Sequence, residues 1–117
     1  MTVHPPHTIS THVLDNERGQ PAVGVQVTLG RWQEVGFVTL AQATTDDNGR
    51  VADLLGAALT AGAYQIRFDV AGYFAQRGGE TSFMRTVAID FEIVDTNRHY
   101  HVPLLMTRFA CTSYRGS

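Results

Sequence analysis

The 117-residue sequence contains no lysine, so all nine of its basic residues are arginine. This absence excludes a Schiff-base lysine, the lysine of a phosphate-binding loop and a lysine general base. Any cation that acts in a site must be a guanidinium, which is planar, permanently charged and able to form paired hydrogen bonds. Eleven acidic residues bring the net charge to -2, which gives no electrostatic attraction to a polyanion. We therefore expect no nucleic-acid partner.

Cysteine and long apolar runs are also scarce. The single cysteine, Cys111, cannot form an intramolecular disulfide or a thiolate cage for zinc, so stability must come from packing or from association with other chains. No stretch approaches the roughly 18 apolar residues of a membrane span, and the first residues lack the pattern of a signal peptide. We expect a cytoplasmic protein without a membrane partner.

The hydrophobic residues that are present occur in short segments with period two, which is typical of strands with one buried face. Turn sequences such as Asp46-Asp-Asn-Gly49 separate them. The predicted strands are residues 9–15, 23–29, 35–45, 64–70, 87–93, 99–106 and 109–114, with a short strand beginning at Arg50. Residues 72–77 are predicted as one short helix. The pattern indicates an all-β sandwich of two sheets, forming one domain over residues 8–117 after a flexible arm, residues 1–7.

Three histidines on two predicted strands are candidate functional residues. His99 and His101 are two residues apart, which places their imidazoles on one strand face about 6 to 7 Å apart. With His12 as a third ligand they could form a zinc site. Residues 98–103 contain no Asp or Glu, however, and we expect no metal. His12 shares a strand face with Ser10, and on this pattern alone it could be a surface, core or site residue.

Two further features carry polar groups in unusual places. Arg50 directly follows a turn, a position that is also typical of an exposed strand end. The chain closes with Tyr114, Arg115, Gly116 and Ser117, which combine an aromatic ring, a cation and a hydroxyl next to the carboxylate. Most C-terminal tails are disordered and carry no function.

In this order along the chain, five sequence blocks resemble the transthyretin-related family, in particular its 5-hydroxyisourate hydrolases. The terminal block is the most specific of the five, because the hydrolases carry it and hormone-carrying transthyretins do not. The blocks are Ser10-Thr-His-Val-Leu-Asp15, Gly19-Gln-Pro-Ala22, Asp47-Asn-Gly-Arg50, His99-Tyr-His-Val-Pro-Leu-Leu105 and Ser113-Tyr-Arg-Gly-Ser117.

This resemblance implies a transthyretin-like sandwich of two four-stranded sheets, assembled as a homotetramer whose subunit pairs extend their sheets edge to edge. It implies hydrolysis of the ring amide of 5-hydroxyisourate at the N1–C6 bond to 2-oxo-4-hydroxy-4-carboxy-5-ureidoimidazoline, a step of urate degradation in purine catabolism that uses no cofactor. The implied catalytic residues are His12, Arg50, His101 and Ser117. The implied substrate-binding residues are His12, Arg50, Tyr114, Arg115 and Gly116.

Two other functions are consistent with such a fold. One is a transthyretin-like carrier of a small aromatic ligand that it does not convert, and the other is an adhesion or regulatory module. In hormone-binding transthyretins other residues stand at the positions of His12 and His101, so the resemblance favours the enzyme. A module without a ligand would have no need for ordered polar residues at its last four positions.

Overall fold

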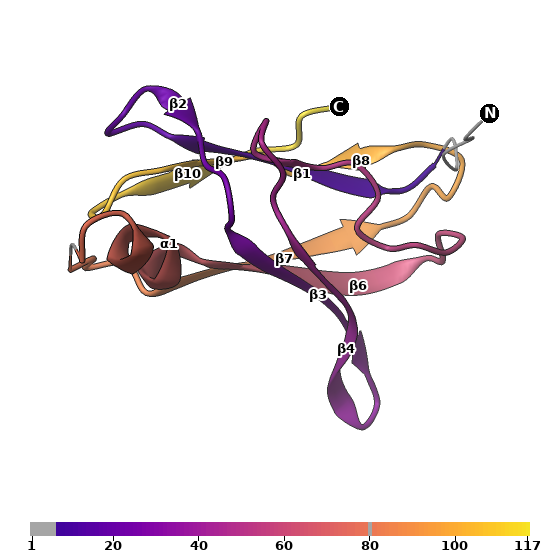
Figure 1. Ribbon diagram of the computed structural model, residues 1–117. Helices are drawn as coiled ribbons and strands as arrows, with labels where there is room; N and C mark the ends of the chain where they lie inside the picture. The colour runs from indigo at the N-terminus through magenta and orange to yellow at the C-terminus, as the bar shows by residue number, and fades with distance from the viewer. Residues whose placement is uncertain (1–6, 80) are drawn as a thin grey trace.

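Two β-sheets lie face to face in the computed structural model, which describes residues 7–79 and 81–117 (Figure 1). One sheet is antiparallel, with the strand order β4-β3-β6-β7. Its strands are β3 (Gln26–Gln33), β4 (Gly36–Thr44), β6 (Gly62–Asp69) and β7 (Thr86–Ile93). The predicted all-β sandwich is therefore confirmed, while the predicted arm lies outside the described residues except for His7.

The other sheet is built around β1 (Ile9–Asp15), whose two edges are each shared by two short strands. One edge pairs with β8 (Tyr100–His101) and then β9 (Leu104–Met106), both parallel to it, and β9 pairs with β10 (Cys111–Ser113). The other edge pairs with β5 (Arg50–Val51) and β2 (Gln20–Pro21). The sheet thus has six strands instead of the expected four, but they occupy four positions.

The interruption between β8 and β9 has a local cause. The predicted strand 99–106 contains Pro103, which has no backbone N–H to donate to a sheet partner. Next to this point Val102 still bonds to β1, once through a side chain and once through the backbone. Thr11 Oγ1 donates to the Val102 carbonyl at 2.7 Å, and the Val102 N–H donates to the Ser10 carbonyl at 2.9 Å. The chain is therefore held against β1 on both sides of Pro103, and His101 is fixed opposite Ser10.

The core lies between the sheets and follows the period-two pattern of the sequence. Val27 and Leu29 of β3 and Ile66 and Phe68 of β6 are almost fully buried, as is Val13 of β1. Alternate residues of the same strands face outward, so a register shift by one residue would expose this set. Strand β3 begins later than expected, at Gln26, and continues to Gln33 beyond the predicted end at residue 29.

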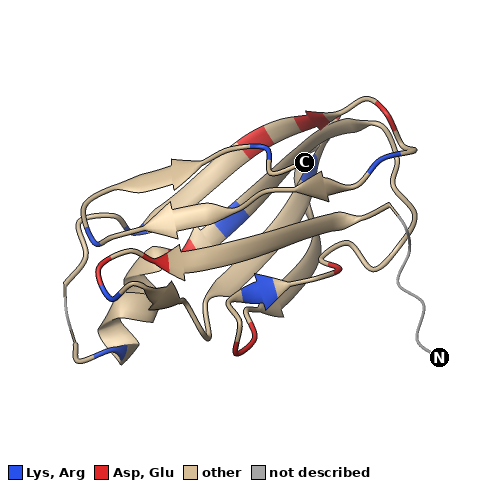
Figure 2. Ribbon diagram, turned by 90° about the horizontal axis from the view of Figure 1, so that it is seen from above, with Lys and Arg blue, Asp and Glu red and all other residues tan. Residues whose placement is uncertain are grey.

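One short helix, α1 (Val70–Gln76), follows β6 at one end of the sandwich (Figure 1). It begins two residues before the predicted start, because Asp69 caps it by accepting a hydrogen bond from the Gly72 N–H at 3.0 Å. No described helix is long and apolar enough to span a membrane. Acidic and basic residues are interspersed over the face seen in Figure 2.

Asp15, at the end of β1, is a buried carboxylate that joins the two layers. It accepts hydrogen bonds from the Tyr73 hydroxyl of α1 at 2.8 Å, from Arg18 Nη1 at 3.1 Å and from the backbone N–H of Glu17 at 2.9 Å. Burial by itself would raise the pKa of Asp15, but the hydrogen bonds from Tyr73, Arg18 and Glu17 together outweigh it and lower the pKa. The ionised form is therefore the one that stabilises the fold.

We expect Asp15→Ala to lower the free energy of unfolding at pH 7 by about 1 to 3 kcal/mol, because it leaves the buried Tyr73 hydroxyl without its acceptor. The contribution of the carboxylate is fully present above its ordinary pKa of 3.8 and is lost as the pH falls through the lowered folded value. Urea unfolding at several pH values measures this. Exposed Asp47→Ala is the control, and an equal loss in both variants would contradict the role of Asp15.

Candidate active site

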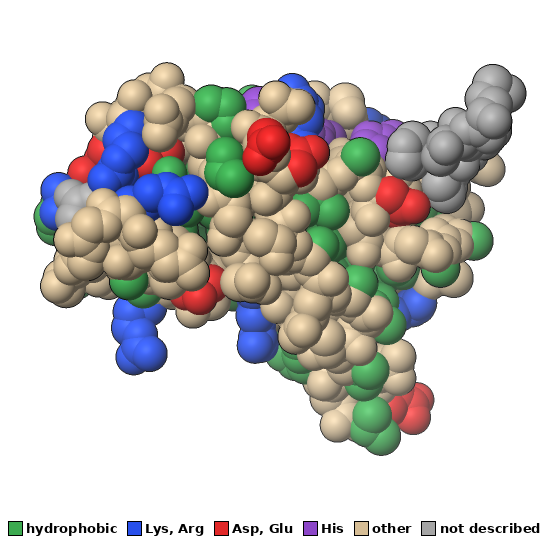
Figure 3. All heavy atoms as spheres, in the orientation of Figure 1, with side chains coloured by type: hydrophobic (Ala, Val, Ile, Leu, Met, Phe, Trp, Pro, Cys, Tyr) green, Lys and Arg blue, Asp and Glu red, His purple; other side chains and the backbone are tan. Residues whose placement is uncertain are grey.

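The side chains of His99 and His101 meet at Ser10, across the pairing of β8 with β1. Ser10 lies opposite His101 in the parallel register. Its Oγ lies 2.7 Å from His101 Nδ1 and 2.7 Å from His99 Nε2. The two imidazoles therefore lie on one face of the strand, as their spacing predicts, with a hydroxyl between them. Figure 3 shows histidine side chains at the surface of this layer.

Arg50 reaches the same face because its turn is held tightly against β1. Asp46 Oδ1 accepts the backbone N–H groups of Asn48 and Arg50, each at 2.9 Å, and these bonds lower the pKa of Asp46. Gly49 has a φ of +75°, and a Cβ there would lie 2.4 Å from the Val13 carbonyl oxygen. The turn thus requires glycine at this position. Arg50 is then placed opposite His12, its partner in the β1–β5 pairing.

The C-terminal tail is attached to the same cluster through its backbone. The Gly116 N–H donates to the His101 carbonyl at 2.7 Å. A Cβ on Gly116 would lie 2.5 Å from His101 Cδ2, so only glycine lets the tail pass this close to the imidazole. Ser117, the next residue, reaches a cleft between β1, β5 and β8. The described residues that line this cleft are Ser10, Thr11, Arg50, Val51, Ala52, His99, His101 and Ser117.

The electrostatics of the cleft keep His101 neutral near pH 7. Burial is the main cause that lowers its pKa below the ordinary 6.5, and the charge of Arg50 and the neighbouring imidazoles of His99 and His12 add to the effect. A neutral imidazole can both accept and donate a proton near neutral pH. A permanently charged guanidinium beside it can stabilise a developing oxyanion. The cleft therefore has the groups that hydrolysis of an amide requires.

His12 lies beside the cleft, and the geometry does not bring it together with the other two histidines as ligands of one ion. It is half-buried on β1, opposite Arg50. His99 Nε2 and His101 Nδ1 are both engaged with Ser10. Among residues 7–79 and 81–117, no group of three His, Cys, Asp or Glu side chains is placed to hold a metal ion.

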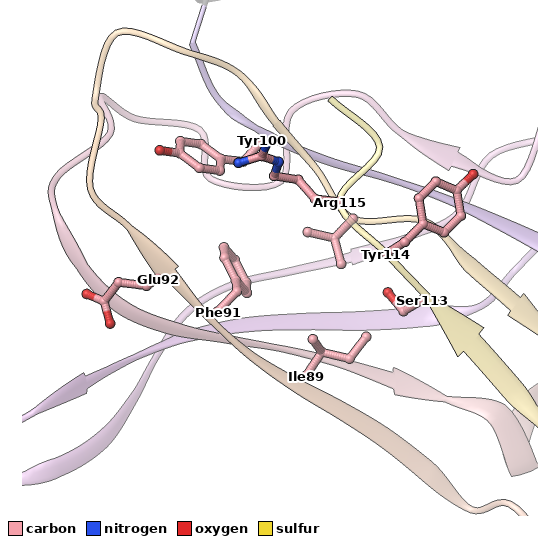
Figure 4. Close-up of a pocket in the computed structure, with 8 residues that line it drawn as sticks. Ile89, Phe91, Glu92, Tyr100, Ser113, Tyr114 and Arg115 are labelled. Atoms are coloured by element: carbon pink, nitrogen blue, oxygen red, sulfur yellow. The ribbon is translucent and has the colours of Figure 1, made fainter.

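The four terminal residues do not share one pocket in the single chain. Gly116 and Ser117 are at the histidine cleft, whereas Tyr114 and Arg115 line a second, mostly apolar pocket. The Gly116 hydrogen bond to His101 continues the antiparallel register of β10 with β9, so the tail runs alongside β8 and its residues line both pockets. Figure 4 shows this second pocket between β7, β8 and the C-terminal segment. Its lining is Ile89, Phe91, Glu92, Tyr100, Val102, Ser113, Tyr114 and Arg115.

Ser10 and His99 belong to the cleft but are absent from the set of site residues that the sequence implied. The sequence pattern did point to both, because alternation places Ser10 on the strand face of His12 and His99 on the strand face of His101. What the sequence could not show is that β1 and β8 pair in parallel with Ser10 opposite His101. Cys111 of β10 is half-buried, and burial raises the pKa of its thiol, so it is not an activated nucleophile.

The sequence and the fold are both similar to those of known proteins. The model of the "HIUase/Transthyretin family" matches residues 9–116. A 5-hydroxyisourate hydrolase of Deinococcus radiodurans is 40% identical over 121 aligned positions, covering all of both chains. The structure of Klebsiella pneumoniae 5-hydroxyisourate hydrolase is 41% identical with a TM-score of 0.82, and the match covers 94% of this chain and 99% of that one.

The fold by itself does not separate the two branches of the family. Sea bream transthyretin in complex with thyroxine superposes with a TM-score of 0.85 at 26% identity, over 95% of this chain and 94% of that one. In sequence the chain is more similar to the two hydrolases, at 40% and 41% identity, than to this transthyretin. By the match over residues 9–116, the chain belongs to the HIUase/Transthyretin family.

Proposed function

We propose that this chain hydrolyses 5-hydroxyisourate at the N1–C6 ring amide, giving 2-oxo-4-hydroxy-4-carboxy-5-ureidoimidazoline in the degradation of urate. The observation that carries the proposal is the cleft in which neutral His101, Arg50 and the terminal Ser117 lie together. The relatives named as 5-hydroxyisourate hydrolases support the choice of substrate.

The reaction needs three tasks, and the cleft together with His12 beside it offers groups for them. A water must lose a proton as it attacks the carbonyl, the resulting oxyanion must be stabilised, and the leaving nitrogen must gain a proton. His12 and His101 are proposed as the pair that positions the water and serves the proton transfers, and Arg50 is proposed for the oxyanion or the substrate carbonyls. Ser117 closes the cleft beside Gly116. A substrate contact by Tyr114 or Arg115 rests on the family resemblance alone.

We also propose that the chain assembles as a homotetramer. Two sheet edges support this, because among residues 7–79 and 81–117 no strand pairs with the outer edges of β7 and β10, which flank the same apolar pocket. An unpaired edge is a template for pairing with another copy. Size-exclusion chromatography with light scattering tests the assembly, and a monomer at micromolar concentration would contradict it.

The test of activity uses 5-hydroxyisourate produced from urate by urate oxidase, with its decay followed by ultraviolet absorbance. We expect the protein to accelerate the decay and a strong chelator to leave that rate unchanged. The control is Arg85→Ala, an exposed arginine on the segment before β7, which should retain the wild-type rate. A wild-type protein that does not accelerate the decay would overturn the hydrolase proposal.

The apolar pocket favours one alternative, a carrier of a small aromatic ligand. Ile89, Phe91, Val102 and the rings of Tyr100 and Tyr114 line it, and such a surface suits an unconverted aromatic molecule (Figure 4). A carrier would bind the ligand without accelerating the decay of 5-hydroxyisourate. The activity measurement therefore separates the two functions.

A further inference from the structure

The hydrogen bonds around Ser10 have a fixed direction that begins at a backbone amide. The Thr8 N–H donates to His99 Nδ1, with 3.4 Å between the nitrogens. A backbone amide can only donate, so His99 Nδ1 must be unprotonated. A neutral imidazole carries one proton, which must then be on Nε2. His99 Nε2 therefore donates to Ser10 Oγ, across the 2.7 Å contact.

The same direction continues to His101. Because Ser10 Oγ accepts a hydrogen bond from His99, its own hydroxyl proton is available for the second contact, 2.7 Å away at His101 Nδ1. His101 Nδ1 is then the acceptor, and the ring proton of neutral His101 is on Nε2. Since Nδ1 is engaged with Ser10, Nε2 is the nitrogen through which this ring can act on a bound substrate.

We propose that His99 and Ser10 are positioning residues that hold the proton of His101 on Nε2, so that His101 meets the substrate as a hydrogen-bond donor and His12 takes the proton from water. The assignment of roles rests on the proposed hydrolysis. Ser10 is almost fully buried and Thr8 still more so, while His99 and His101 are half-buried, so the hydrogen bonds of this network are partly removed from bulk water. If these hydrogen bonds ran in the opposite direction, His99 Nδ1 would carry a proton that faces the Thr8 N–H, and two donors would meet.

The proton and electron balance of the reaction follows from this assignment. Water gives a proton to His12 while its oxygen bonds to the ring carbonyl carbon. The π electrons of the carbonyl move to its oxygen, which Arg50 and His101 Nε2–H stabilise. When the intermediate collapses, the C–N bond breaks with its electron pair on nitrogen, and His12 returns the proton to that nitrogen. His101 thus ends the cycle in the tautomer in which it began.

The test measures the tautomer directly, by two-bond nitrogen–proton NMR correlation of protein labelled with ¹⁵N-histidine, without substrate and at a pH where the rings are neutral. Single histidine replacements assign the signals. We expect the wild type to show the proton of His101 on Nε2. Ser10→Ala and His99→Leu should give a mixture of the two tautomers and lower the turnover of 5-hydroxyisourate about tenfold.

His99→Gln is the matched control, because its amide oxygen can accept from Thr8 while its N–H donates to Ser10. It should restore the wild-type tautomer and most of the turnover. A proton on Nδ1 of wild-type His101, or an unchanged tautomer in Ser10→Ala, would overturn the proposal. If the wild type lacked turnover, the proposed hydrolase function would be wrong. The NMR measurement of the His101 tautomer needs no substrate, so it would still test the arrangement of the hydrogen bonds.

Discussion

Replacing His101 by alanine is expected to lower the rate of 5-hydroxyisourate hydrolysis by about 10²- to 10⁴-fold, the usual contribution of a positioned proton-transfer or donor group. The imidazole is held on three sides, by Ser10 at Nδ1, by Gly116 against Cδ2 and by the pairing of β8 with β1. The loss should appear in kcat, because the donor acts most strongly on the developing oxyanion.

A second substitution separates the chemistry of His101 from its packing. His101→Asn keeps a side-chain group that can accept from Ser10 but has no ring Nε2, so its rate should fall as far as that of the alanine variant. Thermal unfolding and size exclusion should show that both variants remain folded and assembled. Wild-type kcat in either variant would remove His101 from the mechanism.

Local patterns in the sequence predicted most of the strands and the faces of their residues, although β3 is shifted and the predicted strand 99–106 is divided. Alternation in β6 and β7 reflects one buried and one exposed sheet face, a property of each strand by itself. The same rule placed His99 with His101 and Ser10 with His12. The two glycines of the site, Gly49 and Gly116, lay in the blocks that carried the family resemblance.

The remaining features depend on pairing between distant segments, which local patterns do not encode. The contact of Ser10 with His99 joins residues 89 positions apart and exists because β1 and β8 are parallel neighbours. The terminal residues reach two pockets because the tail continues the pairing of β10 alongside β8, with the Gly116 N–H bonded to the His101 carbonyl. The break between β8 and β9 could have been inferred from Pro103, because a proline cannot donate within a sheet.

Replacing Arg50 is expected to give the second large loss of kcat. Two substitutions separate the effect of its charge from the effect of its hydrogen-bond geometry. Arg50→Lys keeps the positive charge but replaces a rigid, planar set of donors with a single ammonium. Arg50→Gln removes the charge. Both should lower kcat about 10²- to 10³-fold, as expected when a donor to an oxyanion is lost.

The two variants should differ in the pKa of His101, because the charge of Arg50 is the largest cause after burial that lowers it. In Arg50→Gln this pKa should rise toward the ordinary 6.5, whereas in Arg50→Lys it should remain lowered. Titration of the His101 ring signals by NMR measures the change without substrate. A kcat near wild type in the lysine variant would mean that charge alone suffices. If both variants lose kcat but differ in the pKa of His101, Arg50 acts on the substrate through its N–H donors and on His101 through its charge.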